Sequence, residues 1–287
     1  MTRVAVVGVG AIGSTVAAAL QQAGGHEVVL CARRDPGHVV VERPDGERVE
    51  LEAPVIVDPR DATPVDWVLL AVKAHQTDGA AGWLSALCGA DTTVAVLQNG
   101  IDHVERVAPL AGAATVLPTV NWCPVEPADG GYRQRGPLRL MAPAGGEGLG
   151  ELFGGEAEVE VRDDFASAAW KKLCANAVAG VLAVTERRTE VLLEPDIRAL
   201  ADTMAVECAA VARAAGASLS DDRAREIVAG LAAMPPDSST SILADREAGR
   251  PLEWEARNAA VGRIARRHGI ATPACDAVAA LLHAVSA

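Results

Sequence analysis

Three glycines near the N-terminus have the spacing of a site for nucleotide phosphates. Gly8, Gly10 and Gly13 follow an apolar run, residues 4–7, and open a helical pattern over about residues 11–23. The first glycine permits a tight turn, the second lets backbone N–H groups approach a pyrophosphate, and the third allows close helix–strand packing. A helix N-terminus also stabilises an anion. The stretch therefore predicts a dinucleotide site in preference to a merely tight turn.

Two arginines stand where the choice of dinucleotide is decided, just after a second predicted strand at residues 26–31. An acid there would hold the ribose 2′-hydroxyl of NAD, whereas arginine suits the 2′-phosphate of NADP. Arg33 and Arg34 precede the first acid, Asp35. Because a guanidinium binds phosphate bidentately, the pair favours NADP(H). The alternative is a solvated charge pair in a loop.

Polar residues also follow two later buried strands. Lys73 comes after the strand pattern of residues 66–72, and Asn99 comes after that of residues 93–97. The carboxyl ends of parallel strands form the edge at which open α/β proteins bind ligands, so both residues are site candidates. The alternatives are a solvated lysine and a turn residue before Gly100.

A lysine and an asparagine share one face of the helix predicted for residues 165–183. Lys172 and Asn176 are four residues apart, and Gly180 follows one turn later. On a stripe of small residues, such a lysine would face a cleft, where desolvation lowers its pKa and suits it to donate a proton. From the pattern alone, the simpler interpretation is that Lys171 and Lys172 lie at a solvated helix edge.

The candidate residues named above are spread over a strand-rich first half of the chain and a helical second half. Apolar strands and short helices alternate up to a last strand at residues 157–161, which predicts a Rossmann-type doubly wound sheet. We expect a hairpin at residues 39–51, a sixth strand at 116–121, and short antiparallel strands at 132–135 and 138–141. The fold class is thus α/β, with an NADP-binding domain at residues 1–163.

Residues 164–287 are expected to form an all-α substrate domain. Glycines and prolines interrupt an almost wholly helical pattern. The expected helices cover about residues 165–183, 196–215, 221–232, 240–248, 252–268 and 272–285.

Composition narrows the class of protein. The 287 residues are 50% hydrophobic and 22% charged, which is an ordinary globular balance. A net charge of −12, without a basic stripe, argues against a nucleic-acid partner. No apolar run reaches membrane-spanning length. The six cysteines show no metal-ligand spacing, so we expect no metal and interpret them as reduced core residues of a cytoplasmic protein.

Five motifs together resemble the ketopantoate reductase (2-dehydropantoate 2-reductase) family along nearly the whole chain. They are GVGAIG at residues 8–13, VKAHQT at 72–77, QNG at 98–100, WKKLCAN at 170–176, and SILAD…RPLEWE…N at 241–258. The glycine motif is common to many dehydrogenases. The other motifs, in this order, are far more specific.

The resemblance implies NADPH-dependent reduction of a 2-oxo acid, by default 2-dehydropantoate, to a 2-hydroxy acid. Lys172 matches the lysine that protonates the carbonyl oxygen, and Glu253 matches the acid that binds the substrate hydroxyl and positions that lysine. The family residues that contact the substrate or the nicotinamide correspond in this chain to Asn99, Asn176 and Ser241. The other family residues that contact the cofactor correspond to Gly8, Gly10, Ala11, Ile12, Gly13, Arg33, Lys73 and Gln76. Alternatively, Glu253 is a first-turn helix carboxylate, and Ser241 is an N-cap or an ST-turn residue after Pro235 and Pro236.

One departure concerns the substrate. The family pattern has a second asparagine two turns after the lysine, where this chain has Gly180. Either another group fills that place, or the vacated space serves a different, bulkier 2-oxo acid. Trp122, which follows the sixth predicted strand, is interpreted as a pocket wall or as core.

Three functions stay open at this point: pantoate formation, reduction of a different ketone on the same fold, and a non-catalytic NADPH-binding regulator. Retention of the lysine, the acid and the amides together argues against the regulator. The apolar C-terminal helices could form a homodimer face or simply close the core.

Overall fold

The computed structural model describes residues 1–286, and the chain divides into two compact units. Unit 1 comprises residues 1–98 and 102–165, and unit 2 comprises residues 99–101 and the chain from residue 166 onward. The short segment Asn99–Ile101 therefore belongs to the helical unit, although it directly follows a strand of unit 1. This assignment places one of the predicted site residues among the helices.

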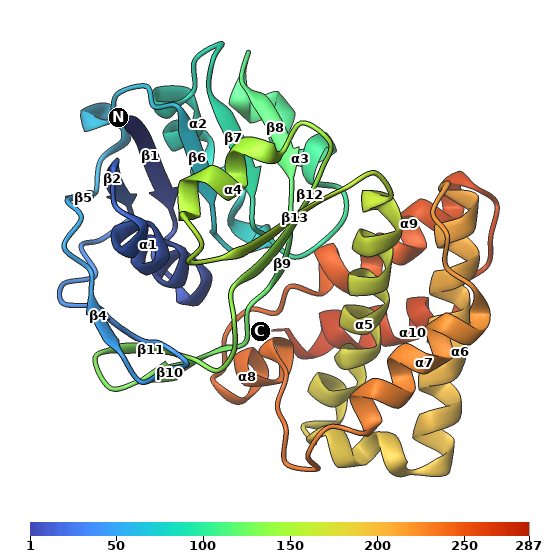
Figure 1. The fold of residues 1–287 in the computed structure, drawn as a ribbon. Coiled ribbons are helices and arrows are strands. Elements are labelled where there is room, and N and C mark those ends of the chain that lie inside the picture. The colour runs from blue at the N-terminus through green and yellow to red at the C-terminus, as the bar shows by residue number, and fades with distance from the viewer. Residues whose placement is uncertain (287) are drawn as a thin grey trace. The chain divides into compact units, whose positions relative to one another are not determined.

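Parallel strands form the central sheet of unit 1, in the order β5-β2-β1-β6-β7-β8 (Figure 1). The chain leaves β1 on one side for β2 and later returns to its other side as β6. This reversal is the topological switch point of a doubly wound sheet, so the predicted Rossmann-type fold is confirmed. The strands are β1 Thr2–Val7, β2 His26–Cys31, β5 Val55–Ile56, β6 Trp67–Leu70, β7 Thr93–Val96 and β8 Thr115–Pro118.

The alternation of side chains along β1 explains how both faces of this sheet are covered. Val4 and Val6 face the core that contains α1 (Ala11–Ala23) and α4 (Glu147–Phe153). Ala5 and Val7 face the opposite core, which contains α2 (Ala81–Leu87) and α3 (His103–Ala111). All four residues are essentially inaccessible to solvent. A continuous apolar run is therefore required in this strand.

Two smaller sheets complete unit 1. One has the order β10-β11-β3-β4, and the other has the order β13-β12-β9. The predicted hairpin is confirmed, since β3 and β4 pair antiparallel. The bounds are β3 Val40–Glu42, β4 Arg48–Glu50, β9 Val120–Trp122, β10 Val125–Ala128, β11 Gly131–Gln134, β12 Arg139–Pro143 and β13 Glu158–Arg162.

The strands expected at 132–135 and 138–141 are present as β11 and β12, and each has one antiparallel neighbour, β10 and β9 respectively. They join different sheets, because β11 also pairs with β3 whereas β12 also pairs with β13. One expectation about the strands is wrong. The expected sixth strand is split between β8 and β9, which join different sheets after Pro118. Proline lacks the N–H that would continue the ladder, and the local pattern does not reveal the distant partners.

Unit 2 is helical (Figure 1). The long helices α5 and α6 contribute many of the buried residues of its core. Its elements are α5 Phe165–Thr185, α6 Pro195–Ala214, α7 Asp221–Ala232, α8 Ser241–Glu247, the π-helical turn η5 Glu255–Ala259, α9 Ala260–Arg267 and α10 Pro273–Val285. Unit 2 also contains the short 3₁₀ turn η4 Thr189–Leu193, whereas three such turns lie in unit 1: η1 Pro59–Asp61, η2 Ala74–Gln76 and η3 Asp78–Ala80. The continuous helix expected over residues 252–268 is incorrect at its start, because Glu253 precedes the helix and the first turn of the helix is π-helical.

Across residues 1–286, no helix combines the length and apolarity needed to cross a membrane.

Candidate functional site

The glycine turn of unit 1 has the geometry that its spacing predicts. Gly8 adopts a φ of +100°, and its N–H donates to the carbonyl of Cys31 at 2.9 Å, which ties the turn to the end of β2. A Cβ on Gly8 would lie 2.7 Å from the backbone nitrogen of Val72. A Cβ on Gly13 would lie only 1.8 Å from the carbonyl oxygen of Gly8. Both positions therefore require glycine.

The middle glycine leaves the N-terminus of α1 open. No atom lies within 4 Å of a Cβ built on Gly10, and this N-cap residue, as a glycine, has no side chain that could occupy the start of the helix. The first turn, which begins at Ala11 and Ile12, has no acidic residue that would compete with an anion. Exposed N–H groups at a helix start favour a phosphate, so a dinucleotide pyrophosphate fits this turn.

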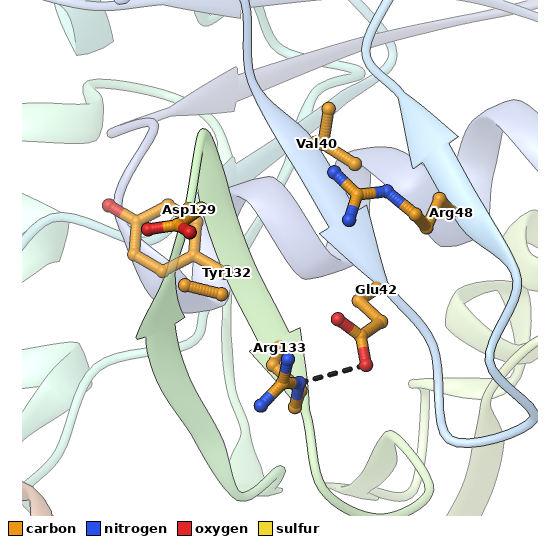
Figure 2. A pocket seen from close by; sticks show the side chains of 7 residues that line it. Val40, Glu42, Arg48, Asp129, Tyr132 and Arg133 are labelled. Atoms are coloured by element: carbon orange, nitrogen blue, oxygen red, sulfur yellow. Dashed lines mark hydrogen bonds and ion pairs between the residues drawn. The ribbon is translucent and has the colours of Figure 1, made fainter.

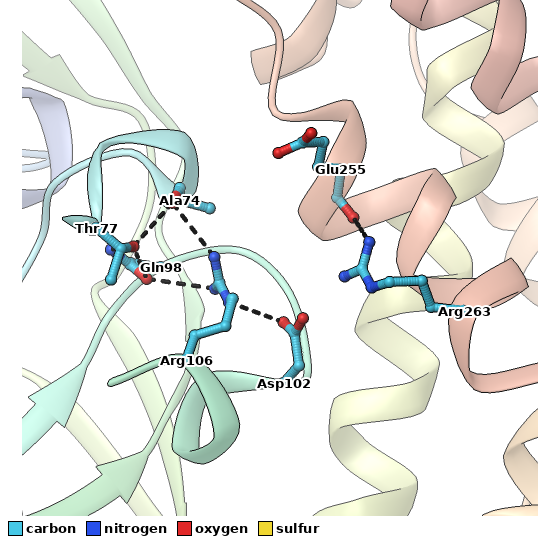
Figure 3. A network of polar contacts seen from close by, with 7 residues as sticks. All are labelled: Ala74, Thr77, Gln98, Asp102, Arg106, Glu255 and Arg263. Carbon is cyan, nitrogen blue, oxygen red and sulfur yellow. Dashed lines mark hydrogen bonds and ion pairs between the residues drawn. The ribbon is translucent and has the colours of Figure 1, made fainter. Parts of the chain in front are cut away.

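A polar network joins the ends of β6 and β7 in unit 1 (Figure 3). The hydroxyl of Thr77 donates to the carbonyl of Ala74 at 2.8 Å and accepts from Gln98 Nε2 at 2.9 Å. Arg106 donates to the same carbonyl at 3.3 Å and lies 3.0 Å from a carboxylate oxygen of Asp102. The network holds η2, the turn that contains the predicted site residue Gln76. Sequence reasoning did not identify Arg106, whose role depends on distant loops.

Lys73 and the arginine pair also lie in loops of unit 1. Lys73 precedes η2 as its N-cap and is half-buried. Arg33 and Arg34 follow β2 and are exposed, and neither makes a hydrogen bond or ion pair within residues 1–286. Two guanidiniums without internal partners are available to a ligand phosphate. This fits a 2′-phosphorylated dinucleotide better than NAD.

Helix α5 carries the predicted proton donor of unit 2. Lys172 and Asn176 lie one turn apart on this helix and are both half-buried. Lys172 is therefore neither fully solvated nor sealed in the core, whereas the next residue, Leu173, is buried. A half-buried amine can meet a ligand while part of its hydration is lost.

The structure brings the predicted substrate residues of unit 2 into one hydrogen-bonded array. Asn99 Nδ2 donates to Glu253 Oε2 at 2.9 Å, and Asn176 Nδ2 donates to Asn99 Oδ1 at 3.3 Å. Glu253 is buried, with 3% of its surface exposed, and it precedes the helix, so the interpretation as a first-turn helix carboxylate is wrong. Residues that lie 77 and 154 positions apart in sequence thus share one polar cluster.

Arg257 completes this array and was not predicted from the sequence. One terminal nitrogen donates to Asn176 Oδ1 at 2.9 Å, and the other donates to Ser241 Oγ at 3.2 Å. Ser241 is the first residue of α8, whose N-cap is Thr240, so Ser241 is not the cap. The array runs in the order Ser241, Arg257, Asn176, Asn99, Glu253.

The Arg257 guanidinium is fully buried, with 2% of the residue exposed. Desolvation lowers its pKa below the ordinary value, while the negative charges of Glu253 and Asp245 act in the opposite direction. Its Nε has no hydrogen-bond partner, and within residues 1–286 it forms no ion pair. A buried cation of this kind is costly to the fold, which marks the cluster as a functional-site candidate.

The space expected beside Gly180 is absent. A Cβ on Gly180 would lie 2.9 Å from Asn258 Nδ2 and 2.9 Å from Leu282 Cδ1. Asn258 reaches this position from η5 and donates to the carbonyl of Ala177 at 2.8 Å. Another amide therefore stands beside the place of the asparagine in the family pattern. The reason for expecting a bulkier substrate is removed.

Two adjacent residues of β9, Asn121 and Trp122, differ in burial. Asn121 is buried, and its amide donates to the carbonyl of Leu97 at the end of β7. Trp122 is 41% exposed, so the interpretation of this tryptophan as core is incorrect.

A separate pocket of about 310 Å³ lies on the four-stranded sheet of unit 1 (Figure 2). Arg133 donates to Glu42 at 2.8 Å across it, and this hydrogen bond is the main reason that the pKa of Glu42 is lowered. None of the predicted site residues lines it. The lining residues are Val40, Glu42, Arg48, Ala128, Asp129, Tyr132 and Arg133.

Among residues 1–286, no cluster of three or more His, Cys, Asp or Glu side chains could hold a metal ion. All six cysteines are free, and Cys31, Cys174, Cys208 and Cys275 are buried.

A doubly wound sheet with a glycine turn, accompanied by a helical unit that carries a lysine, amides and a buried carboxylate, defines a dinucleotide-dependent oxidoreductase. Comparison with known proteins narrows this class. The model of ketopantoate reductase PanE/ApbA matches residues 4–143, and the model of its C-terminal region matches residues 164–286. The chain belongs to the ketopantoate reductase family.

Curated and solved relatives agree with this family. The 2-dehydropantoate 2-reductase of Mycobacterium tuberculosis H37Rv is 43% identical, with 99% of this chain and 98% of the relative covered. The enzyme of the same name from Caulobacter vibrioides is 38% identical over the full length of both chains. The crystal structure of 2-dehydropantoate 2-reductase from Geobacter metallireducens matches with a TM-score of 0.90 at 26% identity, covering 99% of this chain and 100% of that one.

Proposed function

We propose that this protein reduces 2-dehydropantoate (ketopantoate) to pantoate with NADPH. The observation that carries the proposal is the array of Ser241, Arg257, Asn176, Asn99 and Glu253, on a helical unit whose α5 also bears Lys172. Family membership and full-length similarity to 2-dehydropantoate 2-reductases support it.

The chemistry of the reaction assigns roles to these groups. NADPH, when bound, supplies a hydride to the carbonyl carbon of the 2-oxo acid. Negative charge then develops on the carbonyl oxygen, and the Lys172 ammonium stabilises this oxygen and gives it a proton. The products are the 2-hydroxy acid and NADP⁺, and the lysine regains its proton from the solution, so each turnover consumes one NADPH and one proton.

Glu253 and the amides would orient the substrate. 2-Dehydropantoate carries a carboxylate at one end and a hydroxyl at the other. A carboxylate can only accept hydrogen bonds, so Glu253 suits the substrate hydroxyl. Asn99 Nδ2 donates to Glu253 Oε2 at 2.9 Å, which helps to hold this carboxylate in place.

Groups of unit 1 account for the proposed preference for NADPH over NADH. The open N-terminus of α1 fits a pyrophosphate, and the exposed guanidiniums of Arg33 and Arg34 fit a 2′-phosphate. We propose that Lys73, which precedes the η2 turn, and Gln76, the last residue of that turn, contact the same cofactor.

Oxidation of NADPH with a panel of 2-oxo acids and neutral ketones tests this function. We expect steady turnover of 2-dehydropantoate and a much lower kcat/KM for the other ketones. Turnover of other ketones alone would replace the proposed substrate. Tight NADPH binding without turnover would support the regulator instead.

We also infer that the enzyme is a cytoplasmic homodimer. The free cysteines suit a reducing compartment. We place the subunit contact at helix α10, where Leu281 is half exposed. Analytical ultracentrifugation of the parent protein and a Leu281→Arg variant tests the contact.

A further inference from the structure

We propose that Arg257 sets the polarity of the substrate site, so that Ser241 and Asn176 present hydrogen-bond donors to the carboxylate of the 2-oxo acid. The inference deepens the proposed function and rests on it. Arg257 acts as a positioning residue, and its charge also complements the substrate carboxylate.

The first step is the donor inventory of Arg257. A guanidinium carries only donors, so Ser241 Oγ and Asn176 Oδ1 must accept from it. The Ser241 hydroxyl hydrogen is then left to donate elsewhere, and it has no acceptor within residues 1–286. Ser241 is exposed to solvent, whereas Arg257 is buried. The arginine thus turns the hydroxyl into an accessible donor.

The second step is the direction of the amides. Asn oxygen and nitrogen atoms are assigned from their hydrogen-bond partners. Here the residues that flank the two amides in the hydrogen-bonded array, Arg257 and Glu253, indicate the same orientation of both amides. Arg257 can only donate to Asn176, and Glu253 can only accept from Asn99, so both amides are fixed in one direction. One amide hydrogen of Asn176 contacts Asn99, and the other hydrogen remains for a ligand.

The third step is the unpaired charge. Arg257 is buried, its Nε lacks an acceptor, and within residues 1–286 no carboxylate oxygen lies within ion-pair distance of it, so Glu253 and Asp245 act on its charge only from farther away. A buried cation without a contacting anion is costly to the fold. An anion bound by Ser241 and Asn176 would offset this cost by bringing a negative charge closer to the guanidinium. Glu253, at the other end of the array, would repel an anion and accept a hydroxyl, so the two ends differ as the two ends of the substrate do.

The π-helical turn η5 explains how this arginine reaches the site. Two consecutive residues of the turn contact α5: Arg257 donates to Asn176, and Asn258 donates to the carbonyl of Ala177. Such widened turns frequently occur at functional sites. One residue thereby serves the polar array while its neighbour fills the space beside Gly180.

The test compares a charged and an uncharged substrate in Arg257→Met. Steady-state reduction of 2-dehydropantoate and of its methyl ester is measured, together with calorimetric binding of pantoate to the NADP⁺ complex. We expect kcat/KM for the acid to fall about a hundredfold or more, because a buried charged hydrogen-bonding partner is lost. The ester, which lacks the carboxylate, is expected to keep its kcat/KM within a few-fold. Pantoate binding should weaken in parallel with the acid.

Two further variants complete the design. Arg225→Met, which removes an exposed surface arginine of α7, is expected to behave as the parent protein in every assay. Arg257→Lys keeps a positive charge but cannot serve Ser241 and Asn176 in the same fork, so its ratio of acid to ester activity should be intermediate. Because an apolar residue of similar volume relieves a buried charge, Arg257→Met should unfold at a temperature no lower than the parent.

An acid-to-ester ratio that stays at the parent value in Arg257→Met would overturn the inference. Equal losses for both substrates would also overturn it, since they indicate a purely structural role. If Arg257→Met does not fold, Arg257→Lys decides by the same ratio. Failure of the proposed function is distinguishable, because the parent protein would then not turn over 2-dehydropantoate at all.

Discussion

The amide of Asn258 stands beside Gly180, so close that a Cβ at residue 180 would lie 2.9 Å from Asn258 Nδ2 and 3.0 Å from its Oδ1. Asn258 is fully buried and is held by the carbonyl of Ala177 at 2.8 Å. Leu282 closes the same space from α10. Helix α5 can therefore carry no side chain at position 180 unless its neighbours move.

The variant Gly180→Asn is expected to destabilise the protein. Overpacking a filled core costs about 1–3 kcal/mol, which exceeds the gain of less than about 1 kcal/mol from removing a helical glycine. Urea unfolding should show a lower midpoint with an unchanged m-value. The substitution should also lower activity on 2-dehydropantoate, because η5 must shift to make room.

Gly180→Ala is the matched control and should show a smaller loss in the same direction. The double variant Gly180→Asn with Asn258→Gly should recover part of the stability, since one amide then replaces the other. A single Gly180→Asn variant with parental stability would show that η5 yields without cost.

Lys172→Ala should lower kcat by about 10²–10⁴-fold, because the proton donor to the developing alkoxide is removed. NADPH affinity should change little, since the glycine turn and Arg33 belong to unit 1 and Lys172 belongs to unit 2. Stopped-flow reduction and fluorescence titration of NADPH separate these effects. Lys171→Ala, one residue earlier on α5, is the control and should retain kcat. An unchanged kcat in Lys172→Ala would remove this lysine from the mechanism.

The buried thiol of Cys31 predicts a loss of stability at alkaline pH. Burial at the end of β2 raises the pKa of Cys31 from 9.0 to about 12. Because the folded pKa is above the unfolded one, this stability is fully present below pH 9 and is lost as pH rises toward 12. The slope is about 1.4 kcal/mol per pH unit for one proton.

Urea midpoints measured in reductant from pH 8 upward should therefore fall, and Cys31→Ala should fall by about one proton less. Cys88, whose pKa burial raises to about 11, contributes a second, smaller alkaline loss. Identical slopes for the parent and Cys31→Ala would contradict the assignment.

The parts of the fold that local sequence determines were predicted well. The run at residues 4–7, the glycine turn and α1 follow from hydrophobic pattern and glycine spacing, and the predicted bounds of α1 and β2 coincide with the observed ones. Pairings between distant segments could not be predicted in this way. Gly131 pairs with Val40 across the chain, and nothing near either residue indicates the other.

The site shows the same division. Motifs indicated Asn99, Asn176, Ser241 and Glu253, which the structure brings together. Arg257 could not be predicted as a site residue, because it lies four residues after Glu253, and this spacing is typical of a solvated ion pair on a helix surface. Its burial depends on contacts from α5 and α8, and on a π-helical turn that no helical periodicity reveals.

Arg33→Ala should weaken the preference for NADPH over NADH by about ten- to a hundredfold, the effect of losing one charge-assisted hydrogen bond to phosphate. The guanidinium is exposed and has no partner within residues 1–286, so its removal should leave the fold intact. The ratio of kcat/KM values for the two dinucleotides measures the effect, and salt should reduce it in the parent protein. Arg34→Ala, the adjacent variant, shows how much of the preference the second arginine carries. Equal use of NADPH and NADH by the parent protein would refute the assignment of the 2′-phosphate to this loop.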